Sequence, residues 1–296
     1  MRPNVPLSEE KAHVLFQKAH AIRQSIVEML IEAKSGHTAG PLDMADVFSY
    51  LYFHALKYDA KNPSWEYRDR VILSNGHICP VLYATMAHVG YFPVSELKTL
   101  RKFGSKLQGH PHREFLPALE TSSGPLGAGL SQAVGMALAD RMDSGKTSGK
   151  QFVCLTGDGE LDEGQNWEAI MLAGKEKIQN LTVFVDRNNI QIDGFTEDIM
   201  PLNPLADKWR AFGWHVQEVD GHNFRALDGA WTQALSVFDR PSVIICYTIA
   251  SKGIPEFERK YEWHGKPPTT PEEIATARSA LHIVRTMGGK VKGEHE

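Results

Sequence analysis

The stretch that decides the fold is Thr156-Gly157-Asp158-Gly159-Glu160-Leu161-Asp162-Glu163-Gly164, which directly follows the apolar run Phe152-Val153-Cys154-Leu155. The apolar run is typical of a buried strand, and the residues over 163–177 have the pattern of a helix. A second buried strand is expected over 181–185. A strand, a helix and a strand at this spacing form the βαβ unit of a parallel sheet.

The same alternation of strands and helices continues on both sides of this unit. Further strands are expected over 70–73, 214–219 and 242–248, and further helices over 42–54, 126–142 and 226–238. A long amphipathic helix precedes them, with Ser8 as its N-cap, and Gly36 is expected to end it. The predicted fold class is therefore α/β, a parallel sheet with helices on both faces. We expect one domain over 1–286 and a loose tail over 287–296.

Composition excludes several classes of protein. The 296 residues carry 32 Lys and Arg against 36 Asp and Glu, a net charge of −4. No block of basic residues indicates a nucleic-acid or membrane surface, and the longest apolar stretches are far too short for a membrane span. The N-terminus lacks the apolar core of a signal peptide. Cys79, Cys154 and Cys246 are too widely spaced for a metal knuckle and indicate buried thiols of a reducing compartment. We expect a cytoplasmic protein.

The loop that contains Asp158 combines two features that conflict. Backbone N–H groups and a helix N-terminus beyond a strand of a doubly wound sheet bind anions, yet Asp158 would repel a bare phosphate. A divalent cation between them removes the conflict. The next strand ends in Asp186-Arg187-Asn188-Asn189-Ile190, and one crossover brings both loops to the same end of adjacent strands. Carboxylate, amide and carbonyl oxygens suit Mg²⁺ or Ca²⁺ that carries a diphosphate. Asp186 is an alternative ligand, or it only caps a loop.

This pair of loops resembles the thiamine diphosphate-binding motif, and the chain from its first helix to about Pro268 resembles transketolases. Six motifs follow the family's order: Ser35-Gly36-His37; Leu73-Ser74-Asn75-Gly76-His77; Gly109-His110-Pro111 with Glu120-Thr121-Ser122-Ser123-Gly124-Pro125-Leu126-Gly127; the segment from Gly157-Asp158-Gly159 to Asn188-Asn189; Asp220-Gly221-His222; and Trp263-His264-Gly265. The resemblance implies the thiamine diphosphate-binding fold of the diphosphate-binding domain.

The resemblance also implies roles for individual residues. Mg²⁺ would be held by Asp158, Asn188 and the carbonyl of Ile190. The cofactor would be contacted by a larger set, namely His77, Gly124, Leu126, Gly157, Asp158, Gly159, Glu163, Asn188, Ile192 and His264. The catalytic residues around the reacting ketose would be His37, His77, His110 and His264. Histidine suits proton transfer to and from sugar hydroxyls because its unperturbed pKa lies near neutral pH.

Other residues of these motifs have weaker claims. His112 and His222 lie near the motif histidines, and His222 serves only its turn in the simplest interpretation. Glu163 and Glu168 face a neighbouring subunit in the family; alternatively, they only stabilise a helix N-terminus. Two segments depart from the family pattern, Thr38-Ala39-Gly40 after His37 and Ile78-Cys79-Pro80 after His77. We expect the first departure to affect the shape of its loop and the second to reshape the substrate channel.

In the family, the glutamate that contacts the aminopyrimidine ring, the aromatic residues that stack on it and the arginines that bind the sugar phosphate belong to a second domain. No second array of strands and helices follows Pro271. The resemblance therefore implies the N-terminal subunit of a two-chain transketolase, active only with a separately encoded pyrimidine-binding subunit, most simply as α2β2. It would transfer a two-carbon ketol unit from a ketose phosphate to an aldose phosphate.

Two alternatives remain open at this point. The α subunit of a 2-oxo-acid dehydrogenase also binds thiamine diphosphate without a pyrimidine domain, although Trp263-His264-Gly265 argues against it. A non-catalytic scaffold that keeps a vestigial site is the other alternative, and Asp158, Asn188 and the four histidines argue against that.

Overall fold

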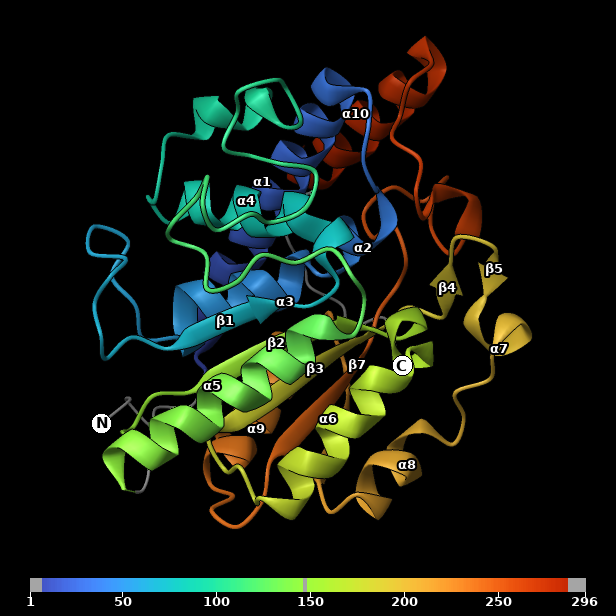
Figure 1. Cartoon of the computed structure of the whole chain (residues 1–296). Coiled ribbons are helices and arrows are strands. Elements are labelled where there is room, and N and C mark those ends of the chain that lie inside the picture. The colour runs from blue at the N-terminus through green and yellow to red at the C-terminus, as the bar shows by residue number, and fades with distance from the viewer. Residues whose placement is uncertain (1–6, 146–147, 287–296) are drawn as a thin grey trace.

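The predicted strands form one parallel sheet in a computed structural model, which describes residues 7–145 and 148–286 (Figure 1). Its spatial order is β1 (Arg70–Leu73), β2 (Phe152–Gly157), β3 (Leu181–Arg187), β7 (Ser242–Tyr247) and β6 (His215–Asp220). All neighbouring pairs are parallel. Strands β2 and β3 run two residues beyond their apolar runs, because their polar ends still pair with each other, as Gly157 does with Asp186.

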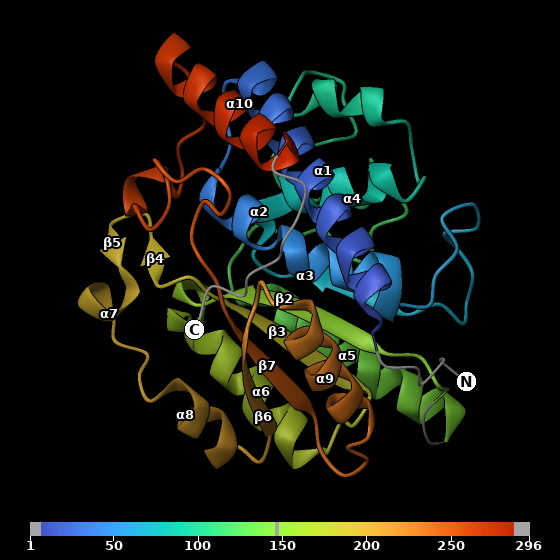
Figure 2. The same ribbon diagram turned by 180° about the vertical axis from the view of Figure 1, so that it is seen from behind.

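Helices cover both faces of the sheet, as predicted (Figures 1 and 2). Side chains alternate along each strand, so that Val153 and Leu155 enter one core and Phe152 and Cys154 enter the other. The second core is closed by α5 (Ala128–Ser144), α6 (Gly164–Lys175) and α8 (Leu205–Ala211). On the first face α9 (Phe224–Leu235) lies against β6 and β7, α3 (Ala45–Tyr50) packs on α9, and α1 (Glu9–Ala33) and α4 (Cys79–His88) pack on α3.

The first helix begins as predicted and ends earlier. The Ser8 side chain accepts a hydrogen bond from the Lys11 backbone N–H, and Glu9 and Glu10 occupy the first turn of α1. The helix ends at Ala33 and is capped by Lys34, which is left-handed at φ 52° and donates its N–H to the Leu30 carbonyl. Gly36 is needed for a different reason, because a Cβ there would lie 2.6 Å from the Leu30 side chain.

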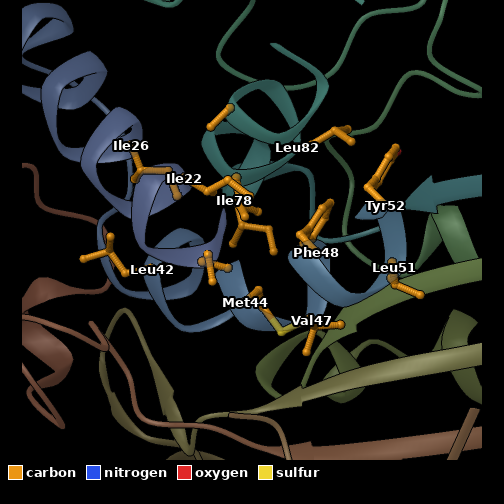
Figure 3. Close-up of a cluster of buried hydrophobic side chains, with 14 of the residues drawn as sticks. Ile22, Ile26, Leu42, Met44, Val47, Phe48, Leu51, Tyr52, Ile78 and Leu82 are labelled. Atoms are coloured by element: carbon orange, nitrogen blue, oxygen red, sulfur yellow. The ribbon is translucent and has the colours of Figure 1, made fainter. Parts of the chain in front are cut away.

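The predicted helix over 42–54 is present with different boundaries, and α4 is a helix that the sequence pattern did not indicate. The segment consists of α2 (Ala39–Asp43), α3 and a π turn over Leu51–Ala55. Nearly every residue of these helices and of α4 is buried, so neither segment shows the apolar stripe of a surface helix. Figure 3 shows the core that they share with α1: Ile22 and Ile26 of α1 lie in one buried cluster with Leu42, Phe48 and Leu82, and with Ile78, which directly precedes α4.

The remaining elements complete the carboxyl end of the sheet. A small antiparallel hairpin, β4 (Ile190–Gln191) and β5 (Gly194–Phe195), follows β3, and α7 (Thr196–Ile199) follows the hairpin. The described chain ends with α10 (Pro271–Thr286), so the predicted tail lies outside the described residues. Cys79, Cys154 and Cys246 are free and buried, as predicted. Within 7–145 and 148–286, no helix is both long and apolar enough to cross a membrane.

Candidate active site

The loops that follow β2 and β3 meet at the carboxyl edge of the sheet, which confirms the predicted adjacency. The Asp158 backbone N–H donates to the Asp186 carbonyl over 3.0 Å. The Asp158 carboxylate accepts from the Asn189 N–H at 2.7 Å through Oδ2 and from the Gly159 N–H at 2.7 Å through Oδ1. One carboxylate therefore joins the Gly-Asp-Gly loop to the Asn-Asn loop.

Asp158 is buried and has a neighbour that the sequence interpretation missed. It is 2% exposed, and its Oδ2 also accepts from Nη1 of Arg187 at 3.1 Å, while Arg187 forms a second ion pair with Glu197. Burial nevertheless raises the pKa of Asp158 to about 6. The arginine engages one carboxylate oxygen, and Oδ1 is left with a single N–H donor, so Oδ1 retains a lone pair for a cation.

Asn188 is held by two buried carboxyl groups. Its Nδ2 donates to Oδ2 of Asp43 at 3.0 Å and to Oδ2 of Asp186 at 3.2 Å, and the other Asp186 oxygen accepts from the Thr248 hydroxyl at 2.5 Å. This orientation leaves Oδ1 of Asn188 as the acceptor side, where it meets the Ile190 N–H at 3.0 Å. Asp186 therefore orients Asn188, and burial raises the pKa of Asp186 to about 7.

These donors fit a magnesium ion rather than a zinc ion. The described part of the chain holds no group of three or more His, Cys, Asp or Glu side chains arranged for a metal. The candidate set instead contains one carboxylate, one amide oxygen and one backbone carbonyl, from Asp158, Asn188 and Ile190. All are hard oxygen donors, and the low ligand charge suits an ion that completes its shell with diphosphate oxygens and water.

The predicted cofactor contacts around these loops differ in how much free space surrounds them. A Cβ on Gly159 would lie 3.0 Å from Oε1 of Gln191, whereas one on Gly124 would meet nothing within 4 Å. Leu126 and Ile192 are 36% and 65% exposed, so both offer apolar surface for a ring. Gly157 differs, because its N–H already donates to the Glu160 carboxylate at 3.1 Å and only its remaining surface can face a cofactor.

Three of the four predicted catalytic histidines form a cluster. The ring centroid of His37 lies 4.8 Å from that of His77 and 5.6 Å from that of His264, and the His77 and His264 centroids are 5.4 Å apart. Among the residues that the structure describes, Nδ1 of His37 and Nδ1 of His264 are buried and have no hydrogen-bond partner, as expected where a ligand supplies the missing group. His110 is exposed and lies outside the ring contacts, but its charge contributes to lowering the pKa of His37 and His77.

The histidine cluster adjoins the candidate metal loops. Ala39, which follows the His37 motif, packs with Ile190 and Ala250 in a small buried group. A Cβ on Gly40 would lie 2.5 Å from the Ile78 side chain and 3.9 Å from Oδ2 of Asp186. The segments that depart from the family pattern therefore pack on each other. Thr38, Ala39 and Ile78 are 0% exposed, so their side chains belong to the core, and an effect of the residues after His77 on the substrate channel stays a prediction.

The free energy of unfolding is expected to fall by roughly 2–4 kcal/mol between pH 7.5 and pH 5 through His37 and His264. Burial lowers the pKa of each to about 4 in the folded chain, whereas an unfolded histidine titrates near pH ~6.5. As the pH falls from ~6.5 toward 4, these two histidines take up protons in the unfolded chain but not in the folded chain. The unfolded chain is therefore favoured, and the stability that the folded chain has above pH ~6.5 is progressively lost. Urea unfolding at both pH values measures this change. Between the two pH values the double variant H37N/H264N should lose clearly less unfolding free energy than the wild type. An equal loss would contradict the assignment of the effect to these two histidines.

The remaining candidate residues are either packed or hydrogen-bonded within the fold, or exposed at the surface. His222 bonds to Asp46 through Nδ1 at 2.7 Å and accepts the Ile249 N–H through Nε2 at 2.9 Å, so both ring nitrogens serve the fold. His112 packs on Phe115, with the ring centroids 4.8 Å apart. Glu163 and Glu168 are exposed at the start of α6, and Glu163 makes no side-chain capping bond there. Their outward orientation leaves them available to a neighbour.

Comparisons with known proteins identify the family of this chain. The family described as "Transketolase, thiamine diphosphate binding domain" matches residues 16–287. The 6-deoxy-6-sulfo-D-fructose transketolase subunit SqwG of Clostridium sp. (strain MSTE9) is 43% identical over 258 residues, 87% of this chain and 92% of that protein. An apulose-4-phosphate transketolase subunit of Actinobacillus succinogenes is 38% identical, over 86% of this chain and 91% of that protein.

A solved structure gives the same result for the fold. The transketolase of Campylobacter jejuni is similar with a TM-score of 0.84 and 34% sequence identity. The match covers 91% of this chain but 43% of the Campylobacter chain, so this chain spans less than half of a one-chain transketolase and nearly all of the two subunits above.

Proposed function

This chain belongs to the transketolase family, as its thiamine diphosphate-binding domain, and we propose that it is the N-terminal subunit of a two-chain transketolase. The enzyme would transfer a two-carbon ketol unit from a ketose phosphate to an aldose phosphate in the cytoplasm. The observation that carries the proposal is the juxtaposition of two features at one edge of the sheet: the oxygen donors around Asp158 and the cluster formed by His37, His77 and His264.

Each feature has a distinct role in the proposal. Asp158, Asn188 and the Ile190 carbonyl would hold Mg²⁺, whose charge would offset that of the diphosphate next to a buried carboxylate. Gly159 allows the diphosphate to approach the backbone, and Leu126 and Ile192 flank the cofactor rings. When bound, thiamine diphosphate supplies the nucleophilic carbon that the protein lacks.

The histidines act on the substrate. His37, His77 and His264 accept and return protons at the hydroxyls beside the breaking carbon–carbon bond, and His110 contributes from the rim. Their pKa values are low in the free chain because burial disfavours the imidazolium form. In the assembled enzyme these imidazoles would lie near the negative charge of the diphosphate, which would favour their protonated form and raise their pKa values toward neutrality, where proton transfer is most effective.

The rest of the site would come from a separate pyrimidine-binding subunit, most simply in an α2β2 assembly. The two relatives of comparable length support this part of the proposal, because both are named as subunits of transketolases. The exposed Glu163 and Glu168 on α6 would then face a second copy of the chain and couple two cofactor sites. The same names favour a transketolase over a 2-oxo-acid dehydrogenase subunit or a scaffold.

Reconstitution tests the proposal. The chain is mixed with a pyrimidine-binding subunit, sought in a neighbouring reading frame, with Mg²⁺ and thiamine diphosphate. Transfer of the ketol unit to an aldose phosphate acceptor is then measured with xylulose 5-phosphate, fructose 6-phosphate, 6-deoxy-6-sulfofructose or apulose 4-phosphate as the donor. We expect turnover only when both chains are present, and loss of turnover in EDTA.

Three results would overturn parts of the proposal. Full turnover by this chain alone would remove the need for a partner. Decarboxylation of pyruvate by the mixture, without ketol transfer, would assign it to the 2-oxo-acid dehydrogenases. If calorimetry detects no Mg²⁺-dependent binding of thiamine diphosphate to the mixture, the chain would instead be a non-catalytic scaffold.

A further inference from the structure

Glu160 is a buried carboxylate with no role in the proposed reaction. It lies in the 3₁₀ turn over Gly159–Asp162, is 3% exposed, and has no ion pair with any residue that the structure describes. Burial raises the pKa of Glu160, and the hydrogen bonds that its carboxylate accepts offset this rise only in part. Glutamate without a cationic partner is rarely retained in a protein interior, so the contacts of this side chain need an explanation.

The carboxylate receives three hydrogen bonds from three different loops. Oε1 accepts from the Ser74 hydroxyl at 2.5 Å and from the Gly127 N–H at 2.7 Å, and Oε2 accepts from the Gly157 N–H at 3.1 Å. The backbone of Glu160 is itself fixed, because its carbonyl accepts from Nδ2 of Asn166 at 2.6 Å. All three groups that face the carboxylate are donors, so the site is built for an anionic acceptor.

Each of these loops carries part of the proposed cofactor site. Ser74 precedes the Asn75-Gly76-His77 motif, Gly127 follows Leu126 at the start of α5, and Gly157 immediately precedes Asp158. The packing between the loops is equally close, because a Cβ on Gly129 would lie 2.5 Å from Cα of Ser74. Gly127 is held in the left-handed region at φ 84°, a conformation that favours glycine.

We propose that Glu160 is a positioning residue, whose carboxylate fixes the three loops in the arrangement that binds thiamine diphosphate. The inference rests on the proposed function. The carboxylate lies behind the loops, so it acts through His77, Leu126 and Asp158 rather than on the cofactor itself. Without the carboxylate, the three donors lose their common acceptor and the loops are less ordered in the free enzyme. Part of the binding free energy of the cofactor is then used to order the loops, so the cofactor binds more weakly.

The test uses the enzyme assembled with its pyrimidine-binding subunit, in saturating Mg²⁺. The variant E160Q keeps the size of the side chain but replaces one acceptor oxygen by a donor, which opposes the N–H groups that face it. We expect calorimetry to show at least about a tenfold rise in Kd for thiamine diphosphate, while kcat at saturating cofactor stays within about threefold. S74A, which removes one donor, should shift Kd in the same direction by a smaller factor.

D140N is the matched control. Asp140 is another buried carboxylate, 8% exposed, and it accepts from Ser148 and pairs with Lys150, both of which precede β2 and so lie at the opposite end of that strand from Gly157. We expect D140N to lower Tm without changing Kd for the cofactor. The inference is overturned if E160Q and S74A bind thiamine diphosphate like the wild type, or no more weakly than D140N does.

The outcomes separate this inference from the proposed function. If the wild-type assembly binds no thiamine diphosphate, the proposed function fails. If the wild type binds and the Glu160 and Ser74 variants bind equally well, only the positioning role fails. If E160Q does not fold, the milder S74A decides the question by the same measurement.

Discussion

Replacing Asp158 with alanine in the assembled enzyme is expected to lower kcat/KM by at least about 10³-fold, or about 4 kcal/mol of transition-state stabilisation. Asp158 is the only carboxylate in the proposed donor set, so its loss removes the charge that holds Mg²⁺ next to the diphosphate. Thiamine diphosphate binding should lose its dependence on Mg²⁺ at the same time. Steady-state kinetics and calorimetry in the presence and absence of the metal measure both effects.

The alanine variant also leaves Arg187 without one of its two ion pairs, so stability needs a separate control. D158N keeps the shape of the side chain, and its one oxygen, placed where Oδ2 lies, can still accept from the Asn189 N–H and from Arg187, whereas the bond from the Gly159 N–H to Oδ1 is lost. We expect D158N to lose nearly as much activity as D158A but to unfold at a higher temperature. A D158N enzyme with kcat/KM within tenfold of the wild type would show that the carboxylate charge is not what holds the metal.

The sheet could be predicted because its strands differ in composition from the segments around them. The run Arg70–Leu73 and the run beginning at Phe152 are short and bounded by turn residues, and the structure confirms both strands. Helix α4 could not be predicted in the same way, because its residues from Cys79 to Ala87 are all buried. A helix that is apolar all round has no stripe to detect.

The contacts of the candidate site also differ in whether the sequence alone could predict them. The adjacency of the Asp158 and Asn188 loops follows from the connectivity of one βαβ unit, which the local pattern contains. The role of Glu160 does not, because its donors Ser74 and Gly127 lie 86 and 33 residues away along the chain. Arg187 lies in the motif after the second strand, but its contact could not be predicted, since only the fold determines that its guanidinium turns back to Asp158. Local sequence therefore predicts contacts between neighbouring loops of one βαβ unit better than contacts between segments that lie far apart in the chain.

The substitution H37N is expected to lower kcat/KM for the ketose donor by about 10²–10³-fold and to leave Kd for thiamine diphosphate within about threefold. His37 is assigned to proton transfer alone, whereas His77 and His264 are also assigned to the diphosphate. H264N should therefore raise Kd for the cofactor as well as lowering kcat. The orphaned Nδ1 of His37 and of His264 is the structural reason to expect a contact with a ligand.

His222 is the matched control, because both of its ring nitrogens already have protein partners in Asp46 and Ile249. H222N should lower Tm, since it weakens a buried hydrogen bond to a carboxylate, and should leave kcat/KM within about threefold. The double variant H37N/H264N should lose less activity than the product of the two single losses, because the rings are 5.6 Å apart and act on one substrate. Strict additivity would indicate that the histidines work at separate steps, and an unchanged H37N enzyme would remove His37 from the catalytic set.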